Sequence, residues 1–165
     1  MALATTTGVA SANNQSSAHR AASGGDVTFG LEAESNSFCT TKAQLAISGI
    51  QVVAAVYDTL TVPNDKGLSV PYLAKSVTPN SDFTIWTIGL RDGVKFHDGS
   101  PVDADAIKAN LDSFRGAPGA ANAGSLLPIV LSFMQDVTVT DPTTVTVTLN
   151  TPVSTFPDYL FLVGR

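Results

Sequence analysis

The stretch GLRDGVKFHDGSP, residues 89–101, joins a predicted strand to a predicted helix and decides how the chain is interpreted. Gly93 and Gly99 stand in two successive turns, where glycine adopts a positive φ at little cost. Between the turns, Val94 and Phe96 alternate with polar residues, so we expect both side chains to point inward. The stretch therefore predicts a chain that folds back on itself.

The same stretch also holds polar residues that could form a catalytic cluster: Arg91, Asp92, Lys95, His97 and Asp98. One histidine beside one aspartate falls short of the ligand count of a metal centre, and the other histidine, His19, lies far away near the N-terminus. Ser100 has no base beside it, and no nucleophile elbow, phosphate loop or zinc-protease motif is present. We interpret the cluster as structural and expect no catalytic residue, no metal site and no cofactor.

The segments next to the stretch predict a strand followed by a helix. Residues 83–91 alternate with apolar side chains on both faces, which favours a strand covered on both sides, with Trp86 in the core. After Pro101 ends the strand, Asp103 is the predicted N-cap of a helix. Four apolar residues at helical spacing form the face that this helix should bury: Ala104, Ile107, Leu111 and Phe114.

The clearest local signal is VTVTDPTTVTVTLN, residues 137–150, which predicts a β-hairpin with its turn at residues 141–144. Valines and Leu149 share one face, and threonines form a solvated face. Further elements are expected along the chain: a strand at 26–31, a polar loop at 33–41, a helix at 42–57 that is buried on most faces, a short strand and turn within 58–67, a short helical turn and loop within 70–82, and an apolar helix at 125–135.

Composition limits the function classes. The chain of 165 residues is long enough for one domain with a core, and its net charge of −5 argues against a nucleic-acid partner. Its most apolar segment, residues 45–57, is too short to span a bilayer. Cys39 is the only cysteine, which excludes an internal disulfide; we expect a small, half-buried apolar side chain there.

The N-terminal segment, residues 1–25, is small and polar with no periodicity. This composition predicts a disordered leader. Ala10 and Ala12 also form an A-x-A pattern of the kind found where signal peptides are cut, so a signal-peptide remnant is the other interpretation. Residues 26–165 form the folded part in either case.

Several motifs together resemble the family 5 solute-binding proteins of ABC importers, the peptide, oligopeptide and nickel group. Within LRDGVKFHDGSP, the matching residues are Leu90, Arg91, Gly93, Val94, Phe96, His97, Asp98, Gly99 and Pro101. Upstream, VYDTLTV (56–62) and VPYLAKSVTPNSDFTIWTIGLR (70–91) resemble further segments of that family. Members of the family are several times longer than this chain, so residues 26–165 resemble the N-terminal part of the first of two lobes.

This resemblance implies an α/β fold with a mixed sheet and helices, the first-lobe portion of a type II periplasmic-binding-protein-like fold. It implies a bacterial extracytoplasmic protein that captures a peptide or other small solute and delivers it to an ABC importer permease, with no enzymatic activity. The loop after the first strand lies at the ligand cleft in such proteins. The resemblance therefore makes Glu34, Ser35, Asn36, Ser37 and Phe38 the candidate ligand-binding residues, with a plain surface loop as the alternative.

A second hypothesis stays open at this point: a secreted structural or adhesive α/β domain that shares only the strand-turn-helix signature. In addition, we expect the isolated chain to be marginally stable, because later chain would cover parts of helix 42–57 and strand 83–91 in the longer family members. Exposed apolar surface there should favour dye binding and self-association. We also expect the isolated chain to show no measurable affinity for peptides that the longer protein would bind, with calorimetry as the test.

Overall fold

The computed structural model describes residues 25–43, 47–120 and 127–163, so the predicted leader lies almost wholly outside the described residues. Residues up to Gly30 and residues from Leu31 onward form two separate units. The strand predicted at 26–31 is wrong: this segment is coil, and Val27 and Phe29 are 92% and 70% exposed. Alternation of apolar and polar residues gives only a propensity for strand formation. A strand also needs a neighbouring strand to accept its hydrogen bonds, and none of the described strands pairs with this segment.

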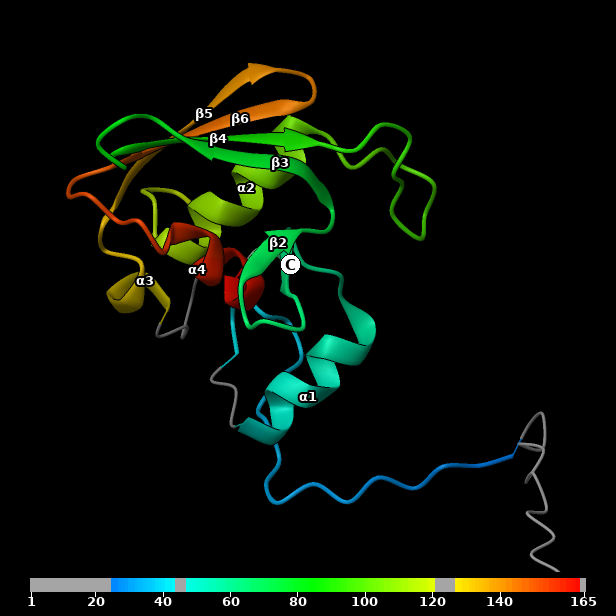
Figure 1. The fold of residues 1–165 in the computed structure, drawn as a ribbon. Coiled ribbons are helices and arrows are strands. Elements are labelled where there is room, and N and C mark those ends of the chain that lie inside the picture. The colour runs from blue at the N-terminus through cyan, green and yellow to red at the C-terminus, as the bar shows by residue number, and fades with distance from the viewer. Residues whose placement is uncertain (1–24, 44–46, 121–126, 164–165) are drawn as a thin grey trace, which may run out of the picture. The chain divides into compact units, whose positions relative to one another are not determined.

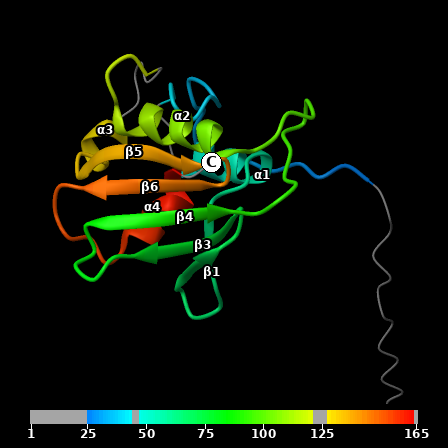
Figure 2. The ribbon, with the colours of Figure 1, turned by 90° about the horizontal axis from the view of Figure 1, so that it is seen from above.

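The second unit is built on a four-stranded sheet with the strand order β3-β4-β6-β5 (Figures 1 and 2). The strands are β3 (Ala74–Pro79), β4 (Ile85–Leu90), β5 (Met134–Asp141) and β6 (Thr144–Leu149). Each pairing is antiparallel. The α/β class is confirmed, with sheets and helices together. No parallel pairing is present among the described strands.

The predicted hairpin is confirmed as β5 and β6. Val137 pairs with Val147 and Val139 with Val145, so these apolar side chains share one face of the sheet. The turn is held by Asp141, whose carboxylate accepts hydrogen bonds from the backbone N–H and the hydroxyl of Thr143 at 2.8 and 3.0 Å. Sequence alternation and turn chemistry therefore specify this part of the fold locally.

Helix α2 (Ala104–Arg115) packs on the inner face of β5 and β6, as Figure 1 shows. The predicted N-cap is confirmed: the Asp103 carboxylate accepts a hydrogen bond from the N–H of Ala106 at 2.9 Å. Gly116 ends the helix in the left-handed region, with φ of 75°. The four residues predicted to face the core, Ala104, Ile107, Leu111 and Phe114, are all buried. Both ends and the buried face of α2 thus follow from the sequence.

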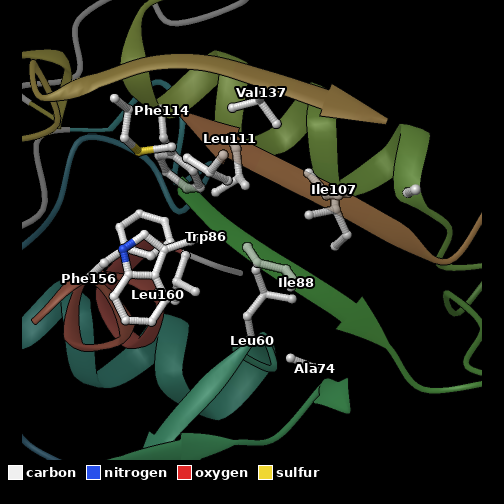
Figure 3. Packing of buried hydrophobic residues seen from close by; sticks show 14 of the residues in the cluster. Leu60, Ala74, Trp86, Ile88, Ile107, Leu111, Phe114, Val137, Phe156 and Leu160 are labelled. Atoms are coloured by element: carbon white, nitrogen blue, oxygen red, sulfur yellow. The ribbon is translucent and has the colours of Figure 1, made fainter. Parts of the chain in front are cut away.

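One core joins α2 to the sheet and to helix α4 (Phe156–Val163), which was not predicted (Figure 3). Trp86 of β4 is 3% exposed, which confirms its core position. Its indole lies 5.4 Å from the ring of Phe156, measured between ring centroids. Leu160, one turn later on α4, is fully buried. The C-terminal helix therefore extends the core beyond the edge of α2.

Two predictions for the strands before α2 are wrong. The helical turn expected within residues 70–82 is absent: β2 (Ser69–Pro71) and β3 occupy this segment. A register shift between Ala74 and Ser76 lets both Ala74 and Val77 pack on the core although they are three residues apart. Strand β4 is covered on one face only, since Ile85 is 40% exposed while Ile88 is fully buried. Among the described residues, nothing packs over the outer face of β4.

Smaller elements surround this core. The short strand β1 (Thr61–Pro63) is confirmed and pairs with β2. The turn after it is held by Asn64, whose side-chain oxygen accepts hydrogen bonds from the N–H groups of Lys66 and Leu68. Helix α3 (Leu127–Val130) is a single turn, shorter than the apolar helix expected at 125–135, because residues from Met134 onward join β5.

Helix α1 (Ile47–Val56) is confirmed as a helix, but the prediction that it is buried on most faces is wrong. Val53 is 1% exposed, whereas Ile50, Val56 and Tyr57 are 38%, 60% and 39% exposed. Figure 1 shows α1 away from the four-stranded sheet, so this sheet does not cover it. None of the helices in the described part of the chain has the length and apolar character to cross a membrane.

We predict that Leu111→Ala destabilises the chain by about 2–5 kcal/mol, because it leaves a cavity between α2 and the sheet. Ile129→Ala is the matched control: Ile129 is 74% exposed, and its truncation should change stability by no more than about 0.5 kcal/mol. Urea unfolding followed by circular dichroism measures both. Equal losses in the two variants would contradict the assigned core.

We also predict that acid destabilises the chain through its turn aspartates. The Thr84 hydroxyl lowers the pKa of Asp82, the Ser100 hydroxyl lowers that of Asp98, and the Thr143 N–H lowers that of Asp141. A depressed folded pKa gives stability that is present above the unfolded value of about 3.9 and is lost as the pH falls through the folded value. The melting temperature should therefore fall below about pH 4, and less steeply in Asp141→Asn. Identical pH curves for the two proteins would contradict this.

Candidate functional site

The five candidate ligand-binding residues lie on the loop before α1. The Ser37 hydroxyl accepts a hydrogen bond from the N–H of Cys39 at 3.0 Å, and Ser35 is half-buried. Glu34 and Phe38 are exposed, Phe38 by 48%. The predicted polar loop is thus confirmed as a segment without helix or strand, whereas the binding role of these residues stays a prediction.

A buried hydroxyl of α1 binds this loop. Ser48, 1% exposed in the first turn of α1, donates a hydrogen bond to the backbone carbonyl of Ala33 at 2.9 Å. The carbonyl of Cys39 accepts from the N–H groups of Lys42 and Ala43, both at 2.9 Å, which closes the far end of the loop. These bonds set the position of residues 33–39 relative to the start of the helix.

A shallow hollow of about 280 Å³ opens between this loop and α1, and we call it the loop–α1 hollow. Three of the predicted residues line it together: Glu34, Ser35 and Phe38. Sequence reasoning missed its other lining residues, Leu31, Ala33 and Gly49. The one available signal concerned Gly49: the pair Ser48-Gly49 lies in a mostly apolar helix, where small residues permit close approach of another segment. Asn36 and Ser37 do not line the hollow.

The hollow combines an apolar wall with two polar groups. Phe38 and Leu31 present partly exposed apolar side chains, and Glu34 is the only charged residue among the described residues that line the hollow. The hydroxyl oxygen of Ser35 is buried and has no hydrogen-bond partner among the described residues. A buried hydroxyl without a partner loses the hydrogen bonds that water would have supplied, so a ligand atom or a small loop movement could satisfy it. The arrangement can bind a small group but contains no nucleophile–base pair.

Cys39 differs from the prediction of a half-buried apolar residue, because its thiol is exposed. The sulfur lies 3.7 Å from the hydroxyl oxygen of Thr41 and contributes nothing to the core. The loop turns at Cys39 with the side chain outward, so burial is decided by the turn rather than by the residue type. The thiol does not line the hollow.

The polar stretch 89–101 lies apart from the hollow and forms an exposed hairpin-like hook. Its turns are confirmed: Gly93 and Gly99 have φ of 76° and 87°, and Asp98 accepts hydrogen bonds from the N–H and hydroxyl of Ser100. The prediction that Phe96 points inward is wrong, since its side chain is 48% exposed. The hook has no second layer beneath that residue, and its one bridge, Lys95 to Pro101, uses backbone alone.

The hook contains no assembled chemical site. His97 and Asp98 are both exposed, and within the described ranges no three His, Cys, Asp or Glu side chains come together as a metal site. Arg91 stacks over the ring of Tyr72, with the guanidinium carbon 6.0 Å from the ring centroid. These contacts serve the chain reversal, which agrees with the structural interpretation of the stretch.

A second hollow, of about 430 Å³, lies at the C-terminal end of α2 and is lined in part by Asp112 and residues 117–120. The Asp112 carboxylate is already paired with Lys108 and Arg115, each at 2.7 Å. Because these pairs neutralise the charge within the helix, this hollow offers little for a ligand to recognise. The loop–α1 hollow is the stronger candidate.

Comparison with known proteins gives a consistent picture. Residues 69–164 match the family model described as bacterial extracellular solute-binding proteins, family 5. A glutathione-binding protein GsiB from Salmonella paratyphi A is 38% identical over 97 residues, which cover 58% of this chain and 18% of the relative. The loop–α1 hollow lies outside the segment that matches the family model.

Solved structures share the fold. The periplasmic binding protein AgaA of A. tumefaciens R10, in complex with agropinic acid, superimposes with a TM-score of 0.67 and 31% identity, over 79% of this chain and 25% of AgaA. The oligopeptide-binding protein AppA of Bacillus subtilis, in complex with a nonapeptide, gives a TM-score of 0.66 at 17% identity, over 76% of this chain and 24% of AppA. The chain thus spans about a quarter of these structures or less.

We predict that Gly99→Ala destabilises the chain by about 1–2 kcal/mol, because an L-residue pays this cost in the left-handed region. The space around Gly99 is open, so backbone strain alone is tested. His97→Ala, two residues earlier, should stay within about 0.5 kcal/mol of wild type. Urea midpoints measure both changes. If His97→Ala were the more damaging variant, the hook would have a role beyond chain reversal.

Proposed function

Because the chain belongs to the bacterial extracellular solute-binding proteins of family 5, we propose that it acts in solute capture for an ABC importer. In this proposal residues 26–165 form the N-terminal part of a first lobe, and the solute is a peptide or a similar small molecule. The protein works outside the cytoplasm of a bacterium and delivers the solute to a membrane permease. No chemical step is required of it.

The observation that carries this proposal is the family match over residues 69–164, which includes the hook and the sheet. The names of the similar proteins support the solute class, since GsiB binds glutathione and AppA is an oligopeptide-binding protein. The same match argues against a structural or adhesive domain, because it extends well beyond the strand-turn-helix signature that such a domain would share.

The loop–α1 hollow is the proposed contact surface for the solute. Solute sites are concave, mostly apolar and equipped with a few polar groups, and the hollow has this composition with Phe38, Glu34 and Ser35. Capture would use groups that the fold already holds in place through the Ser48 hydrogen bond. The remaining contacts of a complete binding cleft would come from other parts of a longer protein.

We predict that a small peptide binds weakly at this surface, in the millimolar range that calorimetry misses. Titration of the ¹⁵N-labelled chain with trialanine, followed by NMR chemical shifts, should perturb residues 31–39 and the first turn of α1. Phe38→Ala should weaken this response, because it removes an apolar wall of the hollow.

Phe96→Ala is the matched control, since Phe96 and Phe38 have the same exposed fraction, 48%, and only Phe38 lines the hollow. The control variant should respond to trialanine as wild type does. Absence of any peptide-dependent shift up to the solubility limit, or shifts confined to the hook, would contradict the proposed contact surface.

A further inference from the structure

We propose that the loop–α1 hollow binds the positively charged amino end of its solute, with the Glu34 carboxylate and the Phe38 ring as its contacts. This inference rests on the proposed function and adds the chemical class of the group that the hollow receives. The similar proteins bind solutes of diverse chemistry, so the class has to come from the residues of this chain.

The charge of the surrounding segment favours a cation. Residues 31–58 carry three carboxylates, Glu32, Glu34 and Asp58, against one ammonium group, Lys42. Lys42 does not line the hollow, and none of the ion pairs found among the described residues involves Glu34. The carboxylate of Glu34 is therefore open to an incoming positive charge. A solute carboxylate would meet a like charge here and no basic partner.

The Phe38 ring supplies the second contact. It is 48% exposed and lines the hollow together with Glu34. An ammonium group over an aromatic face is attracted by the negative charge of the ring centre, and the apolar rest of a small residue can pack on the ring and on Leu31. A carboxylate beside an aromatic ring thus suits an amino group attached to a short apolar stem.

The Ser35 hydroxyl is the independent sign that a ligand belongs here. Its oxygen is buried and makes no hydrogen bond to any described residue, although it lies in the lining between Ala33 and Phe38. A hydroxyl oxygen can accept from an ammonium N–H, and such a bond would remove the cost of leaving the oxygen without a partner. The three groups together provide a charge, a ring face and an acceptor for one ammonium ion.

The backbone holds these groups in register before any ligand arrives. Ser48 fixes the carbonyl of Ala33, the residue directly before Glu34, and the Ser37 hydroxyl accepts from Cys39, the residue directly after Phe38. Both ends of the segment 34–38 are therefore tied. A pre-positioned loop loses less conformational entropy on binding, which favours selection by charge and shape.

The test compares three probes of equal size by NMR titration of the intact chain: trialanine, trialanine amide and N-acetyl-trialanine. We expect the first two, which keep the free ammonium group, to bind at least about tenfold more tightly than the acetylated peptide. Added salt should reduce this preference, because the charges are near the surface. Glu34→Gln should remove the preference and leave the weak binding of the acetylated peptide unchanged.

Glu32→Gln is the matched control: it removes the same charge two residues away, from a side chain that does not line the hollow. It should retain the preference for the free amino group. Equal binding of all three peptides at the hollow would overturn the ammonium inference and leave the proposed solute binding intact. If none of the peptides binds, both the ammonium inference and the proposed solute binding are overturned. If Glu32→Gln removes the preference for the free amino group and Glu34→Gln does not, the assignment of the ammonium contact to Glu34 is wrong.

Discussion

The fold depends on the burial of one helix face against one sheet face. Leu111 and Phe114 of α2 lie against Val137 and Val147, all of them 1% exposed or less. Each such side chain contributes roughly 1.5–3 kcal/mol when removed from water, whereas a whole domain retains only about 5–15 kcal/mol of net stability. Helices and strands that pack on this layer between α2 and the sheet are stabilised by apolar burial. Those that lie away from it depend on local hydrogen bonds.

Helix α2 also covers an edge of the sheet. Strand β5 is an edge strand, and two of its carbonyls accept hydrogen bonds from α2: Lys108 donates to Val137 at 2.6 Å and Arg115 to Gln135 at 2.8 Å. Asp112 lies between the two cations and keeps both side chains in place. Unpaired strand edges invite association with other strands, so this arrangement closes one of them.

The candidate site lies in the part of the chain that this layer supports least. Helix α1 has ten residues and no charged side chain, and among its side chains from Ser48 onward Val53 is the one fully buried large apolar residue. Helices of this length are marginal in water unless a face is packed. The loop–α1 hollow therefore depends on a few local bonds, above all that of Ser48 to Ala33.

The sequence by itself determined the elements whose signals are local. Asp103, the four buried residues of α2 and the hairpin at 137–149 could all be predicted, because capping, helical spacing and strand alternation act within a few residues. The resemblance to solute-binding proteins also came from a continuous motif. From that resemblance, the loop at 34–38 could be proposed as a contact surface. The hollow that this loop lines together with α1 could not be predicted.

Only the tertiary structure decided what each face packs against. Alternation at 26–31 and 83–91 is compatible with a covered strand, yet the first segment is coil and Ile85 is exposed, because burial requires a partner surface that local residues do not specify. Phe96 and Cys39 face outward for the same reason. Glu34, Ser35 and Phe38 line one hollow with Gly49, and the neighbouring Ser48 donates a hydrogen bond to the loop carbonyl of Ala33. Contacts between separate segments depend on chain geometry, which short-range patterns do not encode.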